Sequence, residues 1–348
     1  MSLTRHERLR TNGVTLQVTM QGAGPAVILC HGFPGLGYSW RHQLPALAAA
    51  GYHAIAPDQR GYGRSDRPPE AAAYDADQVM ADMLGLLDAL GLEQAVFVGH
   101  DFGAQEVCNL AVRHPQRVRA LVIMSCPYDF DLAGRGGAGS QADASEIPPG
   151  RAFAIPGVRP SAAFAAIARE HFFHMHYFQA IGPAERELGA APREFLLRLL
   201  HALSAEGRLL DWTRFPSAGT GYLDVLAPAP PLPWRWLSVA EFEHYLAEYT
   251  CAAPDRTFIG GLHSYRMADR NWELGAAYAD ANITQPALFI AGAQDVVLKL
   301  LPADALATQQ RRVPGLRDTV LVPGAGHFVM QEQPQAVNAA LLSFLRGL

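Results

Sequence analysis

The chain has 348 residues, of which 49% are hydrophobic and 18% are charged, and its formal net charge is −5. This composition is ordinary for a globular protein, and the length suits one large domain with an insertion or two domains. Because the charge is small and includes no basic block, nucleic acid and anionic membranes are disfavoured as partners. No apolar run is long enough to span a membrane, and the first residues contain no apolar signal core, so we expect a cytoplasmic protein.

The 4 cysteines and 13 histidines show none of the spacings typical of disulfide frameworks or metal sites. The nearest approach to a metal site is the group His171, His174 and His176, but no neighbouring carboxylate or cysteine completes a set of ligands. Three cysteines lie in apolar patterns and are predicted to be small core residues, namely Cys30, Cys108 and Cys126. We therefore expect neither a metal nor another cofactor.

Residues 1–130 alternate between predicted strands and predicted helices. An alternating pattern predicts a half-buried strand at residues 14–18. Continuous apolar runs, typical of central strands in a parallel sheet, occupy residues 26–30, 54–56, 95–98 and 120–124. Helical spacing predicts one helix that Gly91 ends, and another that continues through residues 107–112 and stops before Pro115. This alternation predicts an α/β fold with a mostly parallel sheet and helices on both faces.

The alternation stops after residue 130. Residues 131–160 are rich in Gly, Pro, Ala and Ser and are predicted to form a long loop, whereas residues 161–279 are predicted to be mostly helical. A helical insertion in an α/β sheet lies over the carboxyl ends of the strands, where such folds bind ligands. We call this inserted lid domain, residues 131–279, the cap.

The strand pattern returns after the cap. Strands are predicted at residues 287–291 and 319–322, and an amphipathic helix is predicted at residues 337–345. The core therefore consists of residues 1–130 and residues 280–348, with the cap inserted between them.

The stretch Gly99-His100-Asp101-Phe102-Gly103 follows a predicted strand and precedes a predicted helix, as in a nucleophile elbow. The turn of such an elbow strains its central residue and requires small residues two positions to either side. A serine at the centre would indicate an esterase or lipase. An aspartate instead displaces at saturated carbon and forms an alkyl-enzyme ester that water later cleaves. The alternative is that Asp101 is only the N-cap of the helix that follows.

Three further motifs follow predicted strands. The loop at His31-Gly32-Phe33-Pro34 can supply a backbone N–H to an oxyanion hole. Asp295 and His327 follow later strands, and the chain order of nucleophile, acid and histidine is that of α/β-hydrolases. The alternative for the acid is Asp129, just after the strand at residues 120–124, and the alternative for His327 is a loop histidine bonded to backbone.

These motifs make the chain resemble the epoxide hydrolases of the α/β-hydrolase superfamily. The resemblance covers nearly all of the core and extends to three other stretches, which are Tyr38–Arg41, Asp58–Ser65 and, in the cap, Gly261–Arg266. It implies an α/β-hydrolase fold and a small-molecule epoxide and water as partners. We expect a monomer or homodimer, and detoxification, catabolism and signalling all stay open as its physiological role. The resemblance also implies that Asp101 attacks the epoxide, that His327 oriented by Asp295 activates water, and that the backbone N–H groups of Phe33 and Phe102 hold the oxyanion.

The family carries two cap tyrosines that bind the epoxide oxygen. The resemblance places Tyr265 at one of these positions and His174 at the other, so that a histidine stands where a tyrosine is usual. A histidine can donate a hydrogen bond to the epoxide, but its protonation depends on its surroundings. There are two alternatives: a shifted alignment that would nominate His171 or Tyr177, or a His174 that is only a hydrogen-bonded histidine of the cap.

Two other classes of function fit parts of the pattern. A haloalkane or haloacid dehalogenase uses the same carboxylate chemistry, but such enzymes usually have Trp or Arg after the nucleophile, where this chain has Phe102. A non-catalytic ligand-binding protein on the same fold is the second alternative, because fold does not fix function.

Overall fold

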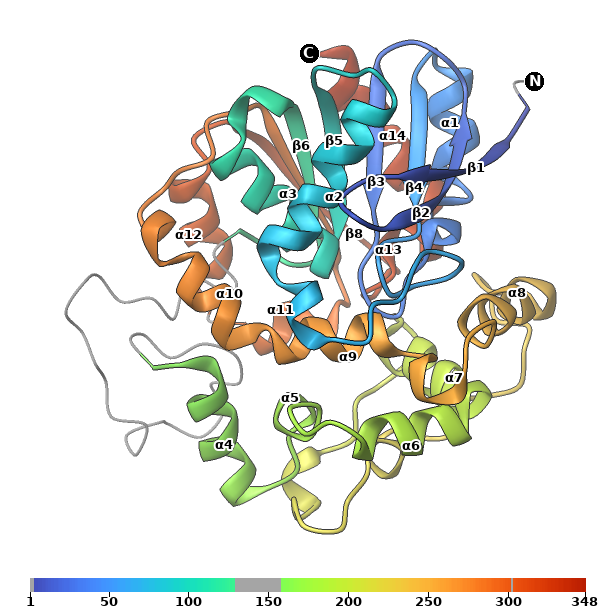
Figure 1. Ribbon diagram of the computed structural model, residues 1–348, viewed down its shortest axis with the longest axis vertical. Coiled ribbons are helices and arrows are strands. Elements are labelled where there is room, and N and C mark those ends of the chain that lie inside the picture. Colours follow the sequence, from blue (N-terminus) through green and yellow to red (C-terminus); the bar gives the residue numbers. More distant parts are fainter. Residues whose placement is uncertain (1–2, 129–157, 302) are drawn as a thin grey trace.

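The computed structural model describes residues 3–128, 158–301 and 303–348 (Figure 1). Its centre is an eight-stranded sheet in the order β1-β2-β4-β3-β5-β6-β7-β8. Neighbouring strands from β4 to β8 pair in parallel, and β2 pairs antiparallel with both β1 and β4. The strands are β1 (Arg5–Arg10), β2 (Thr15–Gln21), β3 (Ala26–Cys30), β4 (His53–Pro57), β5 (Ala95–His100), β6 (Val118–Met124), β7 (Ala287–Gly292) and β8 (Leu316–Val322).

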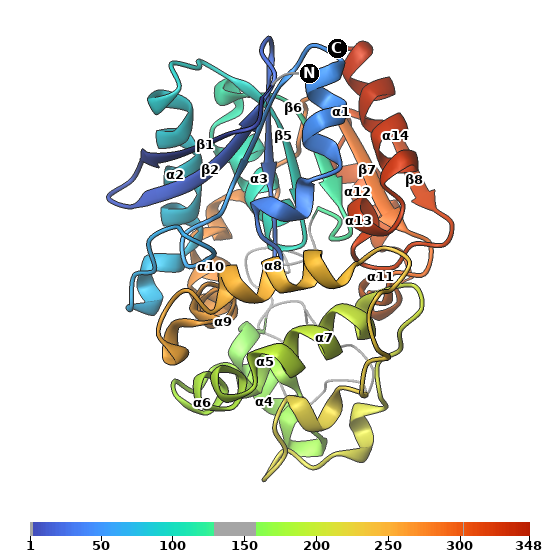
Figure 2. The ribbon, with the colours of Figure 1, turned by 90° about the vertical axis from the view of Figure 1, so that its right-hand side faces the viewer.

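The central strands are apolar because helices cover both faces of the sheet. Every residue of β3, β5 and β7 is buried, as expected for parallel strands between two helical layers. Figure 2 shows α1 (Gln43–Ala49) and α14 (Pro334–Arg346) on one face, and α2 (Ala76–Ala89) and α3 (Phe102–Arg113) on the other. The predicted mostly parallel α/β sheet is confirmed.

The N-terminal strand β1 was not predicted. Its sequence, Arg-His-Glu-Arg-Leu-Arg, is mostly charged, and every residue except the partly buried Leu9 is exposed. Pairing with β2, in a register that sets Arg5 opposite Met20, holds it in the sheet. Charged side chains on such an edge strand oppose pairing with other chains.

A layer of helices covers the carboxyl ends of the parallel strands, in the lower half of Figures 1 and 2. These helices are α4 (Pro160–Glu170), α5 (His174–Tyr177), α6 (Pro183–Ala190), α7 (Pro192–Leu203), α8 (Val239–Tyr249), α9 (Ile259–Arg266) and α10 (Ala268–Leu274). The helical character predicted for residues 161–279 is therefore observed. The loop predicted at 131–160 lies outside the described residues up to residue 157, and the exact bounds of the cap stay a proposal.

The remaining α-helices belong to the second part of the core. They are α11 (Val296–Leu300), α12 (Ala305–Arg312) and α13 (Val329–Glu332), which precede the C-terminal α14. Within the described ranges, no helix has the length and apolar character needed to cross a membrane.

A buried ion pair joins the segment after β4 to helix α2 of the core. The guanidinium of Arg60 contacts both carboxylate oxygens of Asp82 at 2.5 and 2.6 Å, and the two side chains are 3% and 1% exposed. Replacing Asp82 by alanine is expected to lower the free energy of unfolding by about 3–5 kcal/mol, because Arg60 stays buried without its partner. Urea denaturation measures this loss.

The exposed pair of Arg193 and Glu243 provides the control, since its side chains are 53% and 46% exposed. Glu243→Ala is expected to leave the urea midpoint unchanged, because water screens an exposed pair. Equal shifts for the two variants would contradict the role assigned to the buried pair.

Candidate active site

Asp101 occupies a strained turn between β5 and α3. Its backbone has φ 56° and ψ −119°, a region that favours glycine, and its carboxylate caps no N–H of the helix. Asp101 thus stands at the N-cap position of α3, but helix capping does not account for its carboxylate. A Cβ added at Gly99 would lie 2.1 Å from the carbonyl oxygen of Gly103, and one added at Gly103 would lie 2.3 Å from that of Cys30. The two glycines let strand and helix approach closely enough to make this turn.

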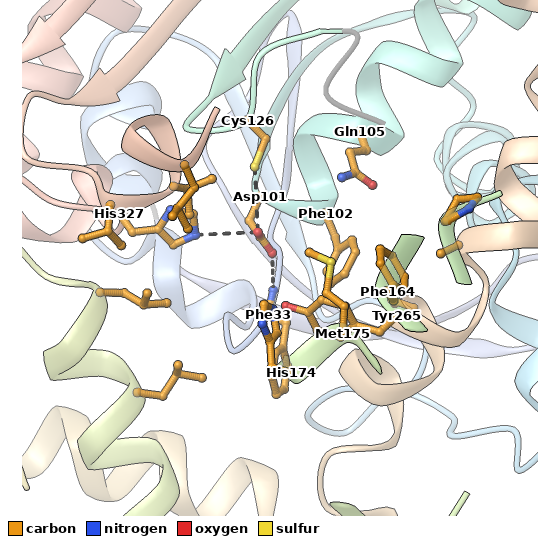
Figure 3. A pocket seen from close by; sticks show the side chains of 18 of the residues that line it. Phe33, Asp101, Phe102, Gln105, Cys126, Phe164, His174, Met175, Tyr265 and His327 are labelled. Carbon is orange, nitrogen blue, oxygen red and sulfur yellow. Dashed lines mark hydrogen bonds and ion pairs between the residues drawn. The ribbon is translucent and has the colours of Figure 1, made fainter. Parts of the chain in front are cut away.

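The two carboxylate oxygens of Asp101 have different surroundings (Figure 3). Oδ1 accepts the N–H of Phe33 at 2.9 Å. Oδ2 lies 3.6 Å from Nε2 of His327 and 3.9 Å from Sγ of Cys126. Burial alone would raise the pKa of Asp101, but the hydrogen bond and charge of His327 lower it below its ordinary value. The carboxylate is thus ionised and able to act as a nucleophile.

His327 lies between two carboxylates. Its Nδ1 is 3.2 Å from both oxygens of Asp295, which follows β7 and accepts the N–H of Val297 at 2.9 Å. Burial alone would lower the pKa of His327, but the charges and hydrogen bonds of Asp295 and Asp101 raise it to about 10. The structure brings together the three residues expected to form the triad. The alternative acid, Asp129, lies outside the described residues.

The backbone of His327 is fixed from both core and cap. Its carbonyl oxygen accepts hydrogen bonds from Nε2 of His100 at 2.7 Å and from Oγ of Ser125 at 3.0 Å. Its N–H donates to the carbonyl of Leu203, the last residue of α7, at 2.9 Å. Burial lowers the pKa of His100 to about 4, so its ring is neutral and Nε2 carries the proton. Sequence reasoning found none of these three hydrogen bonds, because each of them involves the backbone of His327.

The loop after β3 presses against the nucleophile. A Cβ added at Gly32 would lie 2.3 Å from Oδ1 of Asp101. His31 holds this loop, since its Nδ1 is 2.8 Å from the carbonyl of Gly32 and its Nε2 accepts the N–H of Gln59 at 3.0 Å. Burial lowers the pKa of His31 to about 4, which keeps one nitrogen as donor and the other as acceptor.

Two cap side chains face each other near Asp101. The ring of Tyr265, on α9, meets that of His174, at the start of α5, edge to face with centroids 5.6 Å apart. Burial lowers the pKa of His174 to about 3 and raises that of Tyr265 well above its ordinary value, so both side chains are neutral donors. The alternatives point elsewhere: Tyr177 donates to Glu187 at 2.7 Å, and neither it nor His171 lines the cavity at Asp101.

A cavity joins these groups between cap and core. Asp101, His327, Tyr265 and His174 all line it, and most of its other walls are apolar. Sequence reasoning missed several lining residues, among them Cys126, Gln105, Met175, Leu199 and Tyr222. Only Gln105 carried a usable signal, since it follows Asp101 by four positions on a predicted helix. Among the described residues, no group of three or more His, Cys, Asp or Glu could hold a metal ion.

Comparison with known proteins agrees with this geometry. Residues 25–146 match the family described as the alpha/beta hydrolase fold. The chain is 43% identical over 343 residues to epoxide hydrolase A of Mycobacterium tuberculosis, covering 97% of this chain and 96% of that protein. An epoxide hydrolase of Caballeronia sordidicola is 36% identical over 343 residues, with 97% and 92% covered. The chain belongs to the epoxide hydrolase family.

Solved structures of the family share the whole fold. The crystal structure of epoxide hydrolase A from Mycobacterium thermoresistibile is 42% identical with a TM-score of 0.82, covering 99% of both chains. The epoxide hydrolase from an endophytic Streptomyces is 38% identical with a TM-score of 0.84, covering 99% of this chain and 96% of that one. The fold predicted from the motifs, an α/β-hydrolase core with a cap, is confirmed.

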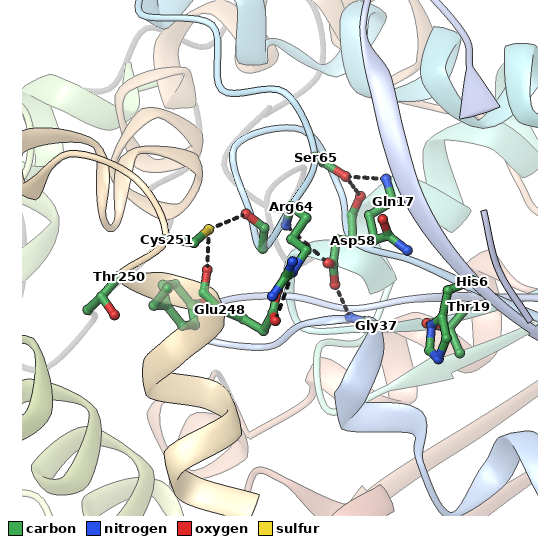
Figure 4. Close-up of polar contacts among 12 residues, drawn as sticks. His6, Gln17, Thr19, Gly37, Asp58, Arg64, Ser65, Glu248, Thr250 and Cys251 are labelled. Carbon is green, nitrogen blue, oxygen red and sulfur yellow. Dashed lines mark hydrogen bonds and ion pairs between the residues drawn. The ribbon is translucent and has the colours of Figure 1, made fainter. Parts of the chain in front are cut away.

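In this epoxide hydrolase the motif Asp58–Ser65 lies outside the cavity and joins core to cap (Figure 4). The buried carboxylate of Asp58 accepts the N–H groups of Gly37 at 2.8 Å and Arg64 at 3.4 Å. Burial raises the pKa of Asp58 to about 6 despite these bonds. The side chain of Arg64 then reaches Glu248 on α8 at 3.0 Å. The motif therefore links the loop after β4 to the cap helix α8.

Gly32→Ala tests how closely the loop after β3 controls the nucleophile. The added methyl group would overlap Asp101 and displace its carboxylate, so we expect kcat/KM for an epoxide to fall about 100-fold or more. Circular dichroism should show a folded protein. Gly347→Ala is the control, because its nearest neighbour is the end of the Arg317 side chain, at 3.2 Å. Full activity in Gly32→Ala would show that the position of the Asp101 carboxylate does not depend on its close approach to Gly32.

Proposed function

We propose that this chain hydrolyses an epoxide to a vicinal diol through an ester on Asp101, as its family membership and its site both favour. The observation that carries the proposal is that the two carboxylate oxygens of Asp101 have different surroundings. Oδ1 is bound by the N–H of Phe33, and Oδ2 is directed toward His327 and lines the cavity that Tyr265 and His174 share. The scheme uses a small-molecule epoxide, water and side-chain groups only.

In the first step, Oδ2 of Asp101 attacks an epoxide carbon, and the bond from that carbon to the ring oxygen breaks. The ring oxygen keeps the electron pair. Tyr265 donates its proton to this oxygen, and His174 donates a hydrogen bond to it. The products are a hydroxyalkyl ester of Asp101 and a phenolate on Tyr265.

Forming the ester changes the proton balance at His327. The carboxylate of Asp101 is one of the charges that raise the pKa of His327, and esterification removes it. His327 can then give its proton to the Tyr265 phenolate, which restores the phenol and leaves a neutral imidazole. The residue that is protonated in the resting enzyme becomes a base after the first step.

In the second step, His327 takes a proton from water as the water oxygen bonds to Cγ of Asp101. The negative charge develops on Oδ1, where the N–H groups of Phe33 and Phe102 stabilise it. Breaking the bond from Cγ to Oδ2 releases the diol, which takes up the proton of the new carboxyl group. Asp295 keeps the imidazole oriented throughout.

The proposal assigns the chemistry to residues 1–130 and 280–348 of the core and substrate binding to the cap, residues 131–279. The division is supported by the origin of the site, with Asp101, Asp295 and His327 on core elements and Tyr265 and His174 on cap helices. A cytoplasmic monomer or homodimer remains the prediction of the sequence.

His327→Gln is expected to accumulate the ester, because alkylation needs only Asp101 and the oxygen-binding side chains. Intact-protein mass after exposure to styrene oxide should rise by the mass of the whole epoxide, and the Asp101→Asn/His327→Gln double variant should show no gain. A parallel exposure to a bromoalkane tests the dehalogenase alternative. A gain equal to the alkyl group without bromine would favour that alternative, and no gain from either compound would contradict both.

His174→Phe removes the second proposed donor. We expect alkylation, measured by stopped-flow tyrosine fluorescence, to slow about tenfold, the usual effect of one lost hydrogen bond. His174→Gln should retain more activity because its amide can donate. Because the pKa of His174 is about 3, its ring stays neutral above pH 5. The alkylation rate of the wild type should therefore show no inflection near pH 6.5 that could be assigned to His174, and the pH profile of His174→Gln should have the same shape.

Tyr177→Phe is the matched control, because the hydroxyl of Tyr177 is bonded to Glu187 and does not line the cavity. Its alkylation rate should equal that of the wild type. If Tyr177→Phe is the slower variant, the shifted alignment is the correct one.

A further inference from the structure

One wall of the cavity carries polar groups that the hydrolysis scheme does not use. Gln105 follows Asp101 by one turn of α3, and its N–H lies 3.4 Å from the carbonyl oxygen of Asp101. Figure 3 shows its side chain on the side of Asp101 away from His327, beyond Phe102. Like Asp101, Gln105 lines the cavity.

The amide of Gln105 has no hydrogen-bond partner among the described residues, although the residue is only partly exposed. An amide carries two donor hydrogens and an acceptor oxygen. The side-chain atoms of Gln105 are not among the buried groups without a partner, so its amide is open to water in the free site. A bound substrate would shield this amide from water, and an acceptor oxygen on the substrate would then avoid the cost of leaving its donors unpaired.

Trp272 on α10 carries a second donor that the hydrolysis scheme does not use. Its ring lines the same cavity, and its indole N–H is buried without a hydrogen-bond partner in the described structure. Two other polar residues that line the cavity from α9 and α10 are already engaged: Asn271 accepts the N–H of Ala76 at 2.8 Å, and Ser264 donates to Gly260 at 2.8 Å. Gln105 and Trp272 therefore both offer unused donors, and an indole N–H can act only as a donor.

The cavity has a different character on the side of His327. The residues that line it there and on the adjoining cap helix are aliphatic, namely Leu199, Leu203, Val296, Val297 and Leu300. Val296 and Val297 directly follow Asp295, which places this wall beside the triad. The two sides of Asp101 therefore present unlike surfaces to the two substituents of an epoxide.

We propose that Gln105 and Trp272 form a subsite for a hydrogen-bond-accepting oxygen of the substrate. The preferred substrate is then an epoxide with a hydrocarbon group on one ring carbon and an ether or carbonyl oxygen on the substituent of the other. Gln105 follows Asp101 by one helical turn of α3, a backbone rise of roughly 5.4 Å, so the probe below carries its ether oxygen four bonds from the ring carbon. The inference deepens the proposed hydrolysis and depends on it.

Two epoxides that differ in one atom test the subsite. They are trans-2-(3-methoxypropyl)-3-propyloxirane and trans-2-pentyl-3-propyloxirane, in which a methylene replaces the ether oxygen. We expect Gln105→Leu to lower kcat/KM for the ether about tenfold and to leave kcat/KM for the hydrocarbon unchanged or higher. Trp272→Phe keeps the aromatic ring, removes the N–H and should act in the same direction.

Gln335→Leu on α14, away from the cavity, is the control and should change neither rate. If Gln105→Leu lowers kcat/KM equally for both probes, the effect is structural. If it changes kcat/KM for neither probe, Gln105 binds no acceptor oxygen. Either outcome overturns the subsite. Wild-type turnover of styrene oxide but of neither probe would also overturn it. The ester trapped in His327→Gln with styrene oxide reports the hydrolysis itself, so failure of the subsite and failure of the function are distinguishable.

Discussion

The contact between Oδ1 of Asp101 and the N–H of Phe33 fixes where every other part of the site must lie. Because one oxygen is bound to the loop after β3, the other must face the cavity. The contact is possible only because Gly32 has no side chain and because the strained backbone of Asp101 lifts its carboxylate above the sheet. The buried hydrogen bonds of His31 keep the loop in place.

The same carboxylate also governs the electrostatics of the site. As an ion it raises the pKa of His327, and in the proposed scheme the ester no longer does. In that scheme the chemical state of Asp101 decides whether the neighbouring imidazole is an acid or a base. Asp295 would keep its charge through both proposed steps and so keep the ring oriented while its protonation changes.

Much of the core could be predicted from the sequence because its strands are buried on both faces. The run at residues 26–30 coincides with β3, since a continuous apolar segment has few other places in a folded chain. The charged strand β1 could not be predicted, because its position depends on pairing with β2 rather than on burial. The proposed triad could be read from the sequence because its members follow the predicted strands that correspond to β5, β7 and β8. His100 and Ser125 were not, since both act on the backbone of a residue more than 200 positions away.

The hydrogen bond between the N–H of His327 and the carbonyl of Leu203 crosses from core to cap. A Cβ at Gly326 would lie 2.4 Å from the backbone of Ser204 and Ala205, so the two segments touch along their main chains. The cap is consequently not an interchangeable module. A chimera that joins this core to the cap of another epoxide hydrolase would have to inherit the backbone path at residues 203–205, or its histidine would lose its place.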